Sequence, residues 1–524
     1  MPSSAKLLQL ALALVLVSSL TSCAVSGGYW LPPRPEATQT PTAFPAPVTP
    51  APQANTTPAT GAVAVLPAGD PPSEPVTPTS TPPEVNTTPI LYYSQAADTL
   101  PVVAVRFGVK PEEIKSTAPL PPTALLPPGQ LLIIPRRLVN TSSSQHLLPD
   151  SELVYSPSAT DFDVAGFVKQ AGGYLSTYTE WLKSTGTTTG ADLVLRVALE
   201  NSINPRLLLA LLEYQGGWVY GGPSNLAQTD YPLGLIDLSQ KGLFQQLVWA
   251  VNQLSVGYYG YREGRLTELY FSDGIQIRLA PDLNAGTVAL QYFFAQLYDG
   301  TRWLQALDVK QGFPALYERM FGSPWLRAQN VEPLYPPGLT QPPMMLPFMK
   351  DQTWSFTGGP HGAWEHDGAY AALDFAPPSS QTGCVKSTVY VAASAAGLVV
   401  RSGKGVVVLD LDGDGQEQTG WVLLYLHVSN DSSVPVGTWV DAGDPLGYPS
   451  CEGGIATGTH LHIARKYNGE WIAAGGPMPF DLSGWVAHTG SAAYIGTLTR
   501  DGETVTACTC ASFVTRVTRT EDTP

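Results

Sequence analysis

Residues 451–464 have the sequence Cys-Glu-Gly-Gly-Ile-Ala-Thr-Gly-Thr-His-Leu-His-Ile-Ala, a glycine-rich loop that runs into an alternating segment. Side chains two residues apart on a β-strand point to the same face, so His460 and His462 are predicted to face one site. Imidazole nitrogen is a common zinc ligand, and a catalytic zinc ion takes three protein ligands and leaves one position for water. An isolated His-x-His pair is more often two half-exposed strand histidines, so the remaining ligands must be sought elsewhere.

Two upstream segments offer candidate partners. Residues 358–361, Gly-Gly-Pro-His, open a glycine-rich aromatic loop, and Asp374 interrupts an apolar run further along. A buried carboxylate without a partner is costly, so Asp374 is predicted to bind a cation or to pair with a base. Residues 421–428 are predicted to form a buried strand with Tyr425 and His427 on one face.

Together these motifs resemble the zinc metallopeptidases of lysostaphin and staphylolysin type, and the staphylolysin (β-lytic) branch most closely. The matching motifs are Gly-Gly-x-His at 358–361, Leu-Asp-Phe at 373–375, Tyr-x-His at 425–427 and Cys-Glu-Gly-Gly-x-x-Thr-Gly-x-His-Leu-His at 451–462. The resemblance implies an antiparallel β-sheet domain over residues 346–490, with the metal in a groove on the sheet. A C-terminal extension, residues 491–524, would follow it.

The same resemblance implies roles for five residues. His361, Asp374 and His462 are expected to be the zinc ligands, and His427 and His460 the catalytic pair that does not bind the metal. Zinc lowers the pKa of its bound water to about 7 and polarises the scissile carbonyl. The pair would then accept the proton of the water, stabilise the oxyanion or protonate the leaving amine.

Two alternatives at this site stay open. His366 competes with His361 as the first ligand, and it ranks second because Gly358-Gly359 precede His361 as they do in the family. The domain as a whole could also be a degenerate copy without metal that only binds or regulates.

The composition limits the other possibilities. The chain has 524 residues, which is too long for one core and predicts three domains with linkers. Its formal net charge is −15 and only 14% of its residues are charged, so it has no electrostatic footprint for a nucleic-acid partner.

The N-terminal region predicts export. Residues 1–23 have a lysine and a short apolar run, as in a secretory signal. Leu20-Thr21-Ser22-Cys23 resembles a bacterial lipoprotein box, which implies a lipid on Cys23 and a membrane anchor facing the cell wall or the extracellular side. The alternative is an ordinary cleaved signal with a chance cysteine. Residues 24–90 are rich in Pro, Thr and Ala and are predicted to be a disordered tether.

Residues 91–137 resemble a LysM module, a small βααβ fold whose family binds N-acetylglucosamine polymers such as peptidoglycan. The resemblance rests on Asp-Thr-Leu at 98–100 and on Pro-Gly-Gln-x-Leu-x-Ile-Pro at 128–135. Ala97 stands where the family usually has glycine, and the proline-rich middle is atypical. A purely structural spacer is the alternative.

Residues 156–330 are predicted to be mainly helical. Asn204-Pro205 is a helix start, because proline is favoured in a first turn. Residues 204–218 resemble the helix that carries the catalytic glutamate in lysozyme-like lytic enzymes, but Gln215 stands in its place and an amide cannot donate the proton. Glu213 lies about 200° around the helix from Gln215 and cannot replace it. An inactive glycan-binding or spacing domain is therefore expected, with an active hydrolase or an unrelated helical domain as alternatives.

Two further patterns concern the peptidase region. Asp410, Asp412 and Asp414 alternate towards a glycine, as at the start of a calcium loop, but position twelve would be Trp421 instead of glutamate, so a tight hairpin is an equal alternative to Ca²⁺. Four cysteines remain after Cys23, and in an exported protein they predict disulfides with three possible pairings. Pairing Cys384 with Cys451 would brace the glycine loop before His460.

The sequence thus predicts a multidomain, envelope-anchored zinc metalloendopeptidase that cuts peptide cross-links or stem peptides of peptidoglycan. One alternative is a non-catalytic peptidoglycan-binding or hydrolase-activating lipoprotein. The other is a glycan hydrolase that acts through the middle domain.

Overall fold

The computed structural model describes residues 88–364 and 367–520. All of these described residues belong to one compact unit. The predicted signal, Cys23 and nearly all of the tether lie outside the described residues. No helix in the described part combines the length and apolarity needed to cross a membrane.

The segment that resembles LysM has one helix fewer than predicted. It comprises β1 (Ile90–Tyr93), α2 (Leu100–Phe107), the 3₁₀ turn η1 (Pro111–Glu113) and β2 (Leu131–Ile134), with β1 and β2 antiparallel. The prolines at 119, 121 and 122 lack the N–H that a helix interior needs, so no second helix forms there. Ala97 has φ 65°, a left-handed conformation that glycine adopts without steric cost.

This segment packs against the helical region that follows it. The Gln95 side chain donates to the carbonyl oxygens of Asp282 and Leu283, and Ala96 lies in the core of the helical region. The Arg278 guanidinium donates to two carbonyls at the end of α2. The segment is therefore attached through backbone carbonyls, which any sequence would offer.

The middle region is helical, as predicted, with two short hairpins. Its helices are α3 (Asp150–Leu153), α4 (Val164–Ala171), α5 (Gly190–Asn201), α6 (Pro205–Gly216), α7 (Leu226–Asp230), α8 (Leu243–Arg262), α9 (Ala285–Leu297), α10 (Gly300–Ala306), α11 (Phe313–Phe321) and α12 (Pro324–Ala328), and its hairpins are β3 (Thr179–Leu182) with β4 (Gly186–Thr189) and β5 (Glu268–Tyr270) with β6 (Gln276–Arg278). Helix α6 begins at Pro205, and the Asn204 side chain accepts from the N–H of Arg206 as its cap.

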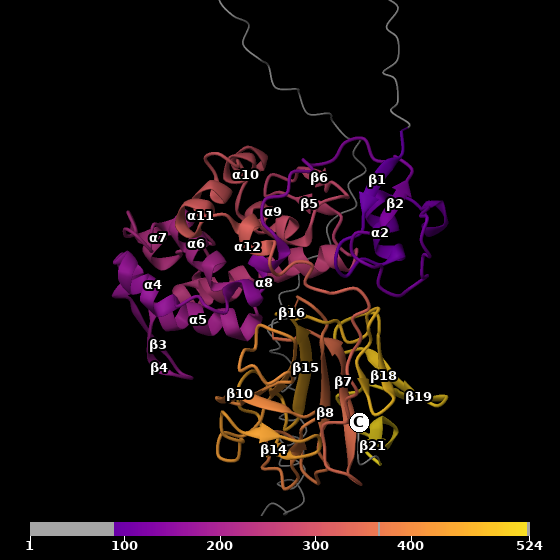
Figure 1. The fold of residues 1–524 in the computed structure, drawn as a ribbon. Helices are drawn as coiled ribbons and strands as arrows, with labels where there is room; N and C mark the ends of the chain where they lie inside the picture. The colour runs from indigo at the N-terminus through magenta and orange to yellow at the C-terminus, as the bar shows by residue number, and fades with distance from the viewer. Residues whose placement is uncertain (1–87, 365–366, 521–524) are drawn as a thin grey trace, which may run out of the picture. The chain divides into compact units, whose positions relative to one another are not determined.

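The C-terminal region is built on one antiparallel sheet with the order β13-β10-β11-β12-β15-β8-β7-β21, with β16 added beside β15 (Figure 1). Its strands are β7 (Thr353–His361), β8 (Ala372–Ala376), β10 (Gly397–Gly403), β11 (Val406–Asp410), β12 (Trp421–Leu426), β13 (Trp439–Val440), β15 (Leu461–Tyr467), β16 (Glu470–Trp471) and β21 (Arg516–Thr518). Smaller sheets pair β9 (Val391–Ala392) with β14 (Pro445–Gly447) and join β17 (Asp481–Leu482), β18 (Trp485–Thr489), β19 (Gly496–Arg500) and β20 (Glu503–Thr506).

The predicted end of this domain at residue 490 is too early. Strand β21 pairs with β7 of the main sheet, and β19 and β20 continue the sheet that β17 and β18 begin. Residues 491–520 therefore complete the domain, because their strands satisfy the backbone hydrogen bonds of its edges.

The two faces of the main sheet lie in different cores. Leu423 and Ile463 face a core within the C-terminal region, whereas Leu424 and Ala464 share a core with the helical region. Polar contacts join the same parts, since the Ser202 hydroxyl donates to the carbonyl of Gly469 at 2.7 Å. One face of the sheet is thus packed against the helical region.

Candidate metal centre

Three predicted ligands meet on neighbouring strands. His361 ends β7, Asp374 lies in β8 and His462 lies in β15, directly opposite Asp374 in the pairing. The distance from His361 Nε2 to His462 Nδ1 is 3.0 Å, and each of these atoms lies 3.3 Å from Asp374 Oδ1. All three residues are buried, so the cluster is shielded from bulk water.

The strands explain why these side chains converge. Asp374 and His462 alternate with Leu373 and Ile463, whose side chains lie in the opposite core, so both point to the face that packs towards the helical region. The β7–β8 register shifts before His361, and such a bulge re-aims a side chain.

The hydrogen bonds of the ligand histidines define which nitrogens are protonated. His361 Nδ1 lies 2.8 Å from the carbonyl of Gly359, and His462 Nε2 lies 2.9 Å from the carbonyl of Ala363. A carbonyl only accepts, so these two nitrogens carry the hydrogens. In the neutral rings, the facing nitrogens, His361 Nε2 and His462 Nδ1, then each carry a lone pair.

This arrangement fits a cation. Two imidazole lone pairs and Asp374 Oδ1 converge, and no donor among residues 88–364 and 367–520 hydrogen-bonds to that oxygen. Three acceptors at such distances repel one another unless a positive charge lies among them. Two nitrogens and one carboxylate oxygen are a typical ligand set for catalytic zinc, with a fourth position open. The residues present therefore fit a zinc ion.

The pKa shifts show that the carboxylate and the two rings are strongly coupled by charge. Burial raises the pKa of Asp374, but the facing His361 and His462 rings outweigh it and hold the pKa well below its usual value. Burial lowers the pKa of His361, yet the Asp374 carboxylate outweighs it and raises the pKa above its ordinary value. For His462 burial dominates and its pKa is lowered. The carboxylate is ionised and available to a cation.

The two other predicted histidines lie beside the ligands. His460 directly precedes β15, and its Nε2 is 3.7 Å from Asp374 Oδ1. The ring of His427, which follows β12, lies with its centroid 4.4 Å from that of His460. Each Nδ1 contacts a carbonyl at 2.8 Å, that of Glu452 for His427 and that of Gly458 for His460. In the neutral ring of each residue, Nε2 is therefore the acceptor.

His427 is buried, and its pKa is shifted strongly. Burial is the main cause, and the neighbouring His460 and His462 add to it, so the pKa of His427 is lowered to about 3. The ring is therefore neutral at physiological pH, and its Nε2 can accept a hydrogen bond.

The prediction that Tyr425 and His427 share one face is wrong. Tyr425 lies in the core of the C-terminal region, and its hydroxyl accepts from the N–H of Ser394. His427 has φ 67°, which ends the strand and rotates its ring out of the alternation. A non-glycine residue in this region is strained, and such strain is held by surrounding contacts.

Several groups at the site were missed by sequence reasoning. The Tyr494 ring stacks on His361 with centroids 4.1 Å apart and an interplanar angle of 20°. It comes from the segment predicted as an extension, and no motif marks it. The orienting carbonyls were also missed, because every residue has a carbonyl and only the fold selects among them.

The alternative ligand and the cysteines have different outcomes. His366, the alternative first ligand, lies outside the described residues. Cys384 and Cys451 form a disulfide, the pairing considered above, and Cys508 bonds to Cys510.

The acidic loop forms a hairpin between β11 and β12. Carboxylate oxygens of Asp410, Asp412 and Asp414 lie within 4.8 Å of one another. The Asp410 carboxylate accepts from the backbone N–H groups of Gly413 and Gly415, which accounts for the hairpin without an ion. Calcium there stays a prediction.

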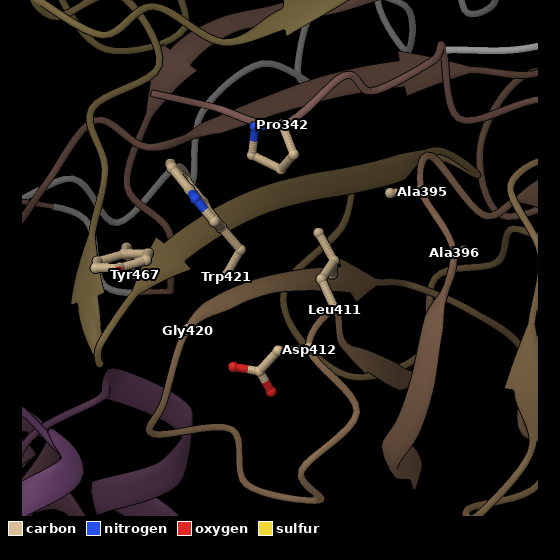
Figure 2. A pocket seen from close by; sticks show the side chains of 8 residues that line it. All are labelled: Pro342, Ala395, Ala396, Leu411, Asp412, Gly420, Trp421 and Tyr467. Carbon is tan, nitrogen blue, oxygen red and sulfur yellow. The ribbon is translucent and has the colours of Figure 1, made fainter. Parts of the chain in front are cut away.

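A pocket of about 400 Å³ lies at the start of β12 and the end of β15 (Figure 2). It is lined by Pro342, Ala395, Ala396, Leu411, Asp412, Gly420, Trp421 and Tyr467. Trp421 precedes His427 by six residues, which is ~20 Å of extended strand. The pocket is therefore separate from the metal centre.

In the middle region, the two candidate residues Glu213 and Gln215 both form hydrogen bonds within the fold. The Glu213 carboxylate accepts from the N–H groups of Val219 and Tyr220, beyond the end of α6. The Gln215 side chain accepts from the hydroxyl of Tyr298. Glu213 is thus committed to the backbone that follows its helix.

Comparison with known proteins places these regions. Residues 146–334 match the family model of the LasA N-terminal domain, and residues 374–474 match that of peptidase family M23. Protease LasA of Pseudomonas aeruginosa strain UCBPP-PA14 is 30% identical over 300 residues, which are 52% of this chain and 65% of the relative. The chain thus spans a little under two thirds of the length of that relative.

Two solved structures also match part of the chain. The deep-sea M23 metalloprotease pseudoalterin has 24% identity and a TM-score of 0.27, over 32% of this chain and 96% of that one. The catalytic domain of lysostaphin, an antimicrobial peptidase from Staphylococcus simulans, has 24% identity and a TM-score of 0.17, over 24% of this chain and 89% of that one. The chain is therefore similar to protease LasA over about half of its length, with residues 146–334 matching the LasA N-terminal domain and residues 374–474 matching peptidase family M23.

Proposed function

We propose that this protein is a zinc-dependent metalloendopeptidase that hydrolyses peptide bonds in the cross-links or stem peptides of peptidoglycan. The observation that carries the proposal is the convergence of His361 Nε2, Asp374 Oδ1 and His462 Nδ1 within 3.3 Å, with the outer nitrogen of each ring bonded to a backbone carbonyl. The match to peptidase family M23 supports a peptidase, and zinc is inferred from the ligand set and from that family.

In the proposed reaction, three residues bind the metal and two others transfer protons. A zinc ion held by His361, Asp374 and His462 would supply Lewis acidity and lower the pKa of water. His427 and His460 lie beside these ligands, each with Nδ1 bonded to a carbonyl so that Nε2 is left for the reaction. We infer that this pair accepts the proton of the attacking water and returns it to the leaving amine.

The substrate and the location are part of the proposal. The match to peptidase family M23, together with the resemblance of the motifs to lysostaphin-type enzymes, favours a cell-wall peptide. Within the proposal, the LysM-like segment, residues 91–137, binds glycan, and the helical region contributes binding or spacing. A lipid on Cys23 would anchor the exported enzyme to the membrane, with the Pro-rich tether allowing it to reach the wall.

Zinc content and cleavage products of the full chain test the proposal. We expect one zinc ion per chain and new amino and carboxyl ends in digested peptidoglycan, both lost in His462→Ala. His488→Ala is the matched control, because His488 is exposed and bonds to Thr499 away from the cluster. Zinc retained in His462→Ala would refute the ligand assignment. Products with only new reducing sugar ends would refute the peptidase.

A further inference from the structure

The loop at residues 450–454 hydrogen-bonds to both the ring and the backbone carbonyl of His427. His427 Nδ1 donates to the carbonyl of Glu452 at 2.8 Å. The carbonyl of His427 accepts from the N–H of Ser450 at 2.6 Å and from its hydroxyl at 3.0 Å. The position of this loop therefore decides which way the ring faces and which nitrogen is protonated.

The side chain of Glu452 ties the loop to the segment after His427. Its carboxylate accepts from the Ser429 hydroxyl at 3.2 Å and from the N–H of Asn430 at 3.1 Å. The Asn430 side chain in turn accepts from the N–H of Gly405 at 2.9 Å. Charge-assisted bonds of this kind are stronger than neutral ones, so the carboxylate is a specific anchor.

A covalent bond holds the same loop from its other side. Cys451, next to Glu452, is bonded to Cys384. The segment around Cys384 also bonds to the residue before His460, since the N–H of Thr459 donates to the carbonyl of Gly383 at 3.0 Å. Ile455, just beyond, is 90% exposed, so little apolar packing holds the loop there.

We propose that Glu452, held in place by the Cys384–Cys451 disulfide, is a positioning residue for the reaction. Its carbonyl keeps His427 in the tautomer with hydrogen on Nδ1, which leaves Nε2 as the acceptor beside the metal ligands. Neither Glu452 nor the disulfide touches a ligand of the metal in the described contacts, so their loss affects turnover and spares zinc. The expected effect on kcat rests on the proposed function, whereas the expected effect on the His427 tautomer does not.

The test compares Glu452→Ala with Glu452→Gln in the full chain. Loss of an outer partner of a catalytic histidine is expected to lower kcat about 10- to 100-fold in Glu452→Ala, with KM and zinc content unchanged. Glu452→Gln retains an acceptor oxygen and should keep most of the activity. Nitrogen NMR of His427, assigned with His427→Gln, should show hydrogen on Nδ1 in the wild type and a mixture of tautomers in Glu452→Ala.

The disulfide is tested with a matched pair of variants. Cys384→Ser/Cys451→Ser should lower kcat and mix the His427 tautomers at full zinc content. Cys508→Ser/Cys510→Ser removes the other disulfide and should do neither.

Three results would overturn the inference. These are a wild-type kcat in Glu452→Ala, zinc loss that parallels the loss of kcat, or an unchanged tautomer in both Glu452→Ala and the Cys384/Cys451 variant. If the wild type cleaves no peptide, the proposed function fails, while the tautomer measurement still tests the positioning of His427.

Discussion

At the scale of single residues, the chemistry depends on which histidine nitrogen carries the hydrogen. Four backbone carbonyls, those of Gly359, Ala363, Glu452 and Gly458, each accept from one imidazole. A backbone carbonyl cannot be removed by mutation, so substitution of an accepting residue changes the ring orientation only by moving its backbone, as proposed for Glu452. The close packing around the ligands is more vulnerable.

Gly358 provides a test of that packing. A Cβ at this position would lie 2.5 Å from Asp374 Oδ2 and 2.9 Å from its Cγ, so Gly358→Ala should displace the carboxylate. We expect zinc affinity to fall about 10- to 100-fold, as for other disturbed ligand supports, measured by competition with a chelator. Gly300→Ala is the control, since a Cβ there meets nothing within 4 Å. Unchanged affinity in Gly358→Ala would contradict the placement of Asp374.

At the scale of elements, antiparallel pairing brings together residues that are far apart in the chain. Strands β7, β8 and β15 are neighbours in the sheet, which is why ligands from residues 361, 374 and 462 meet (Figure 1). Hairpin β11–β12 positions His427 beside them, and this hairpin depends on its acidic loop.

Asp410 is the main support of that loop. It is fully buried, and its carboxylate accepts from the N–H groups of Asp412, Gly413 and Gly415. Asp410→Ala leaves these donors without their acceptor, so the free energy of unfolding should fall by ~1–3 kcal/mol. Denaturant titration measures this loss, with the exposed Asp431→Ala as the control. Equal stability of the two variants would show that the loop does not rely on Asp410.

At the scale of the whole described unit, Arg262 joins its three regions. The guanidinium donates to the carbonyl of Ala96 and lies 3.0 Å from Asp150 and 3.1 Å from Glu470. These partners belong to the LysM-like segment, the helical region and the peptidase domain. Because several carboxylates lie near the buried Arg262, we expect the free energy of unfolding to depend on pH.

Glu332 is the group that gives this dependence its direction. Two causes raise the pKa of Glu332 from 4.5 to about 7: burial is the main one, and the nearby Asp150 carboxylate is the second. The folded state therefore favours the protonated carboxyl. The stability that this group contributes is fully present below about pH 4.5 and is lost as pH rises through about 7.

Glu332→Gln should remove this loss. The amide oxygen can still accept from the N–H of Ser151, as the Glu332 carboxylate does at 2.9 Å. We expect the variant to be more stable than the wild type at about pH 8, by on the order of 1 kcal/mol, and equal to it at about pH 4.5. Thermal unfolding across this range measures it, with the exposed Glu318→Gln as the control. If the two proteins differed more in stability at about pH 4.5 than at about pH 8, Glu332 would not be the source of this pH dependence.

The sequence by itself determined the residues that converge at the metal centre and the type of fold that carries them. Short motifs, period-two alternation at 461–467 and the helix start at Asn204-Pro205 are local signals, and local backbone preferences preserve them in the fold. The segment after α2 also follows local chemistry, since its prolines exclude the helix that the resemblance to LysM implied.

Only the tertiary structure decided how those residues are oriented and what covers them. The left-handed φ of His427, the stacking of Tyr494 on His361, the pairing of β21 with β7 and the burial of Leu424 beside the helical region all join parts distant in sequence. Such contacts have no local signal, because a carbonyl, an aromatic ring or a strand edge becomes a partner only when the packing of the whole chain brings it into reach.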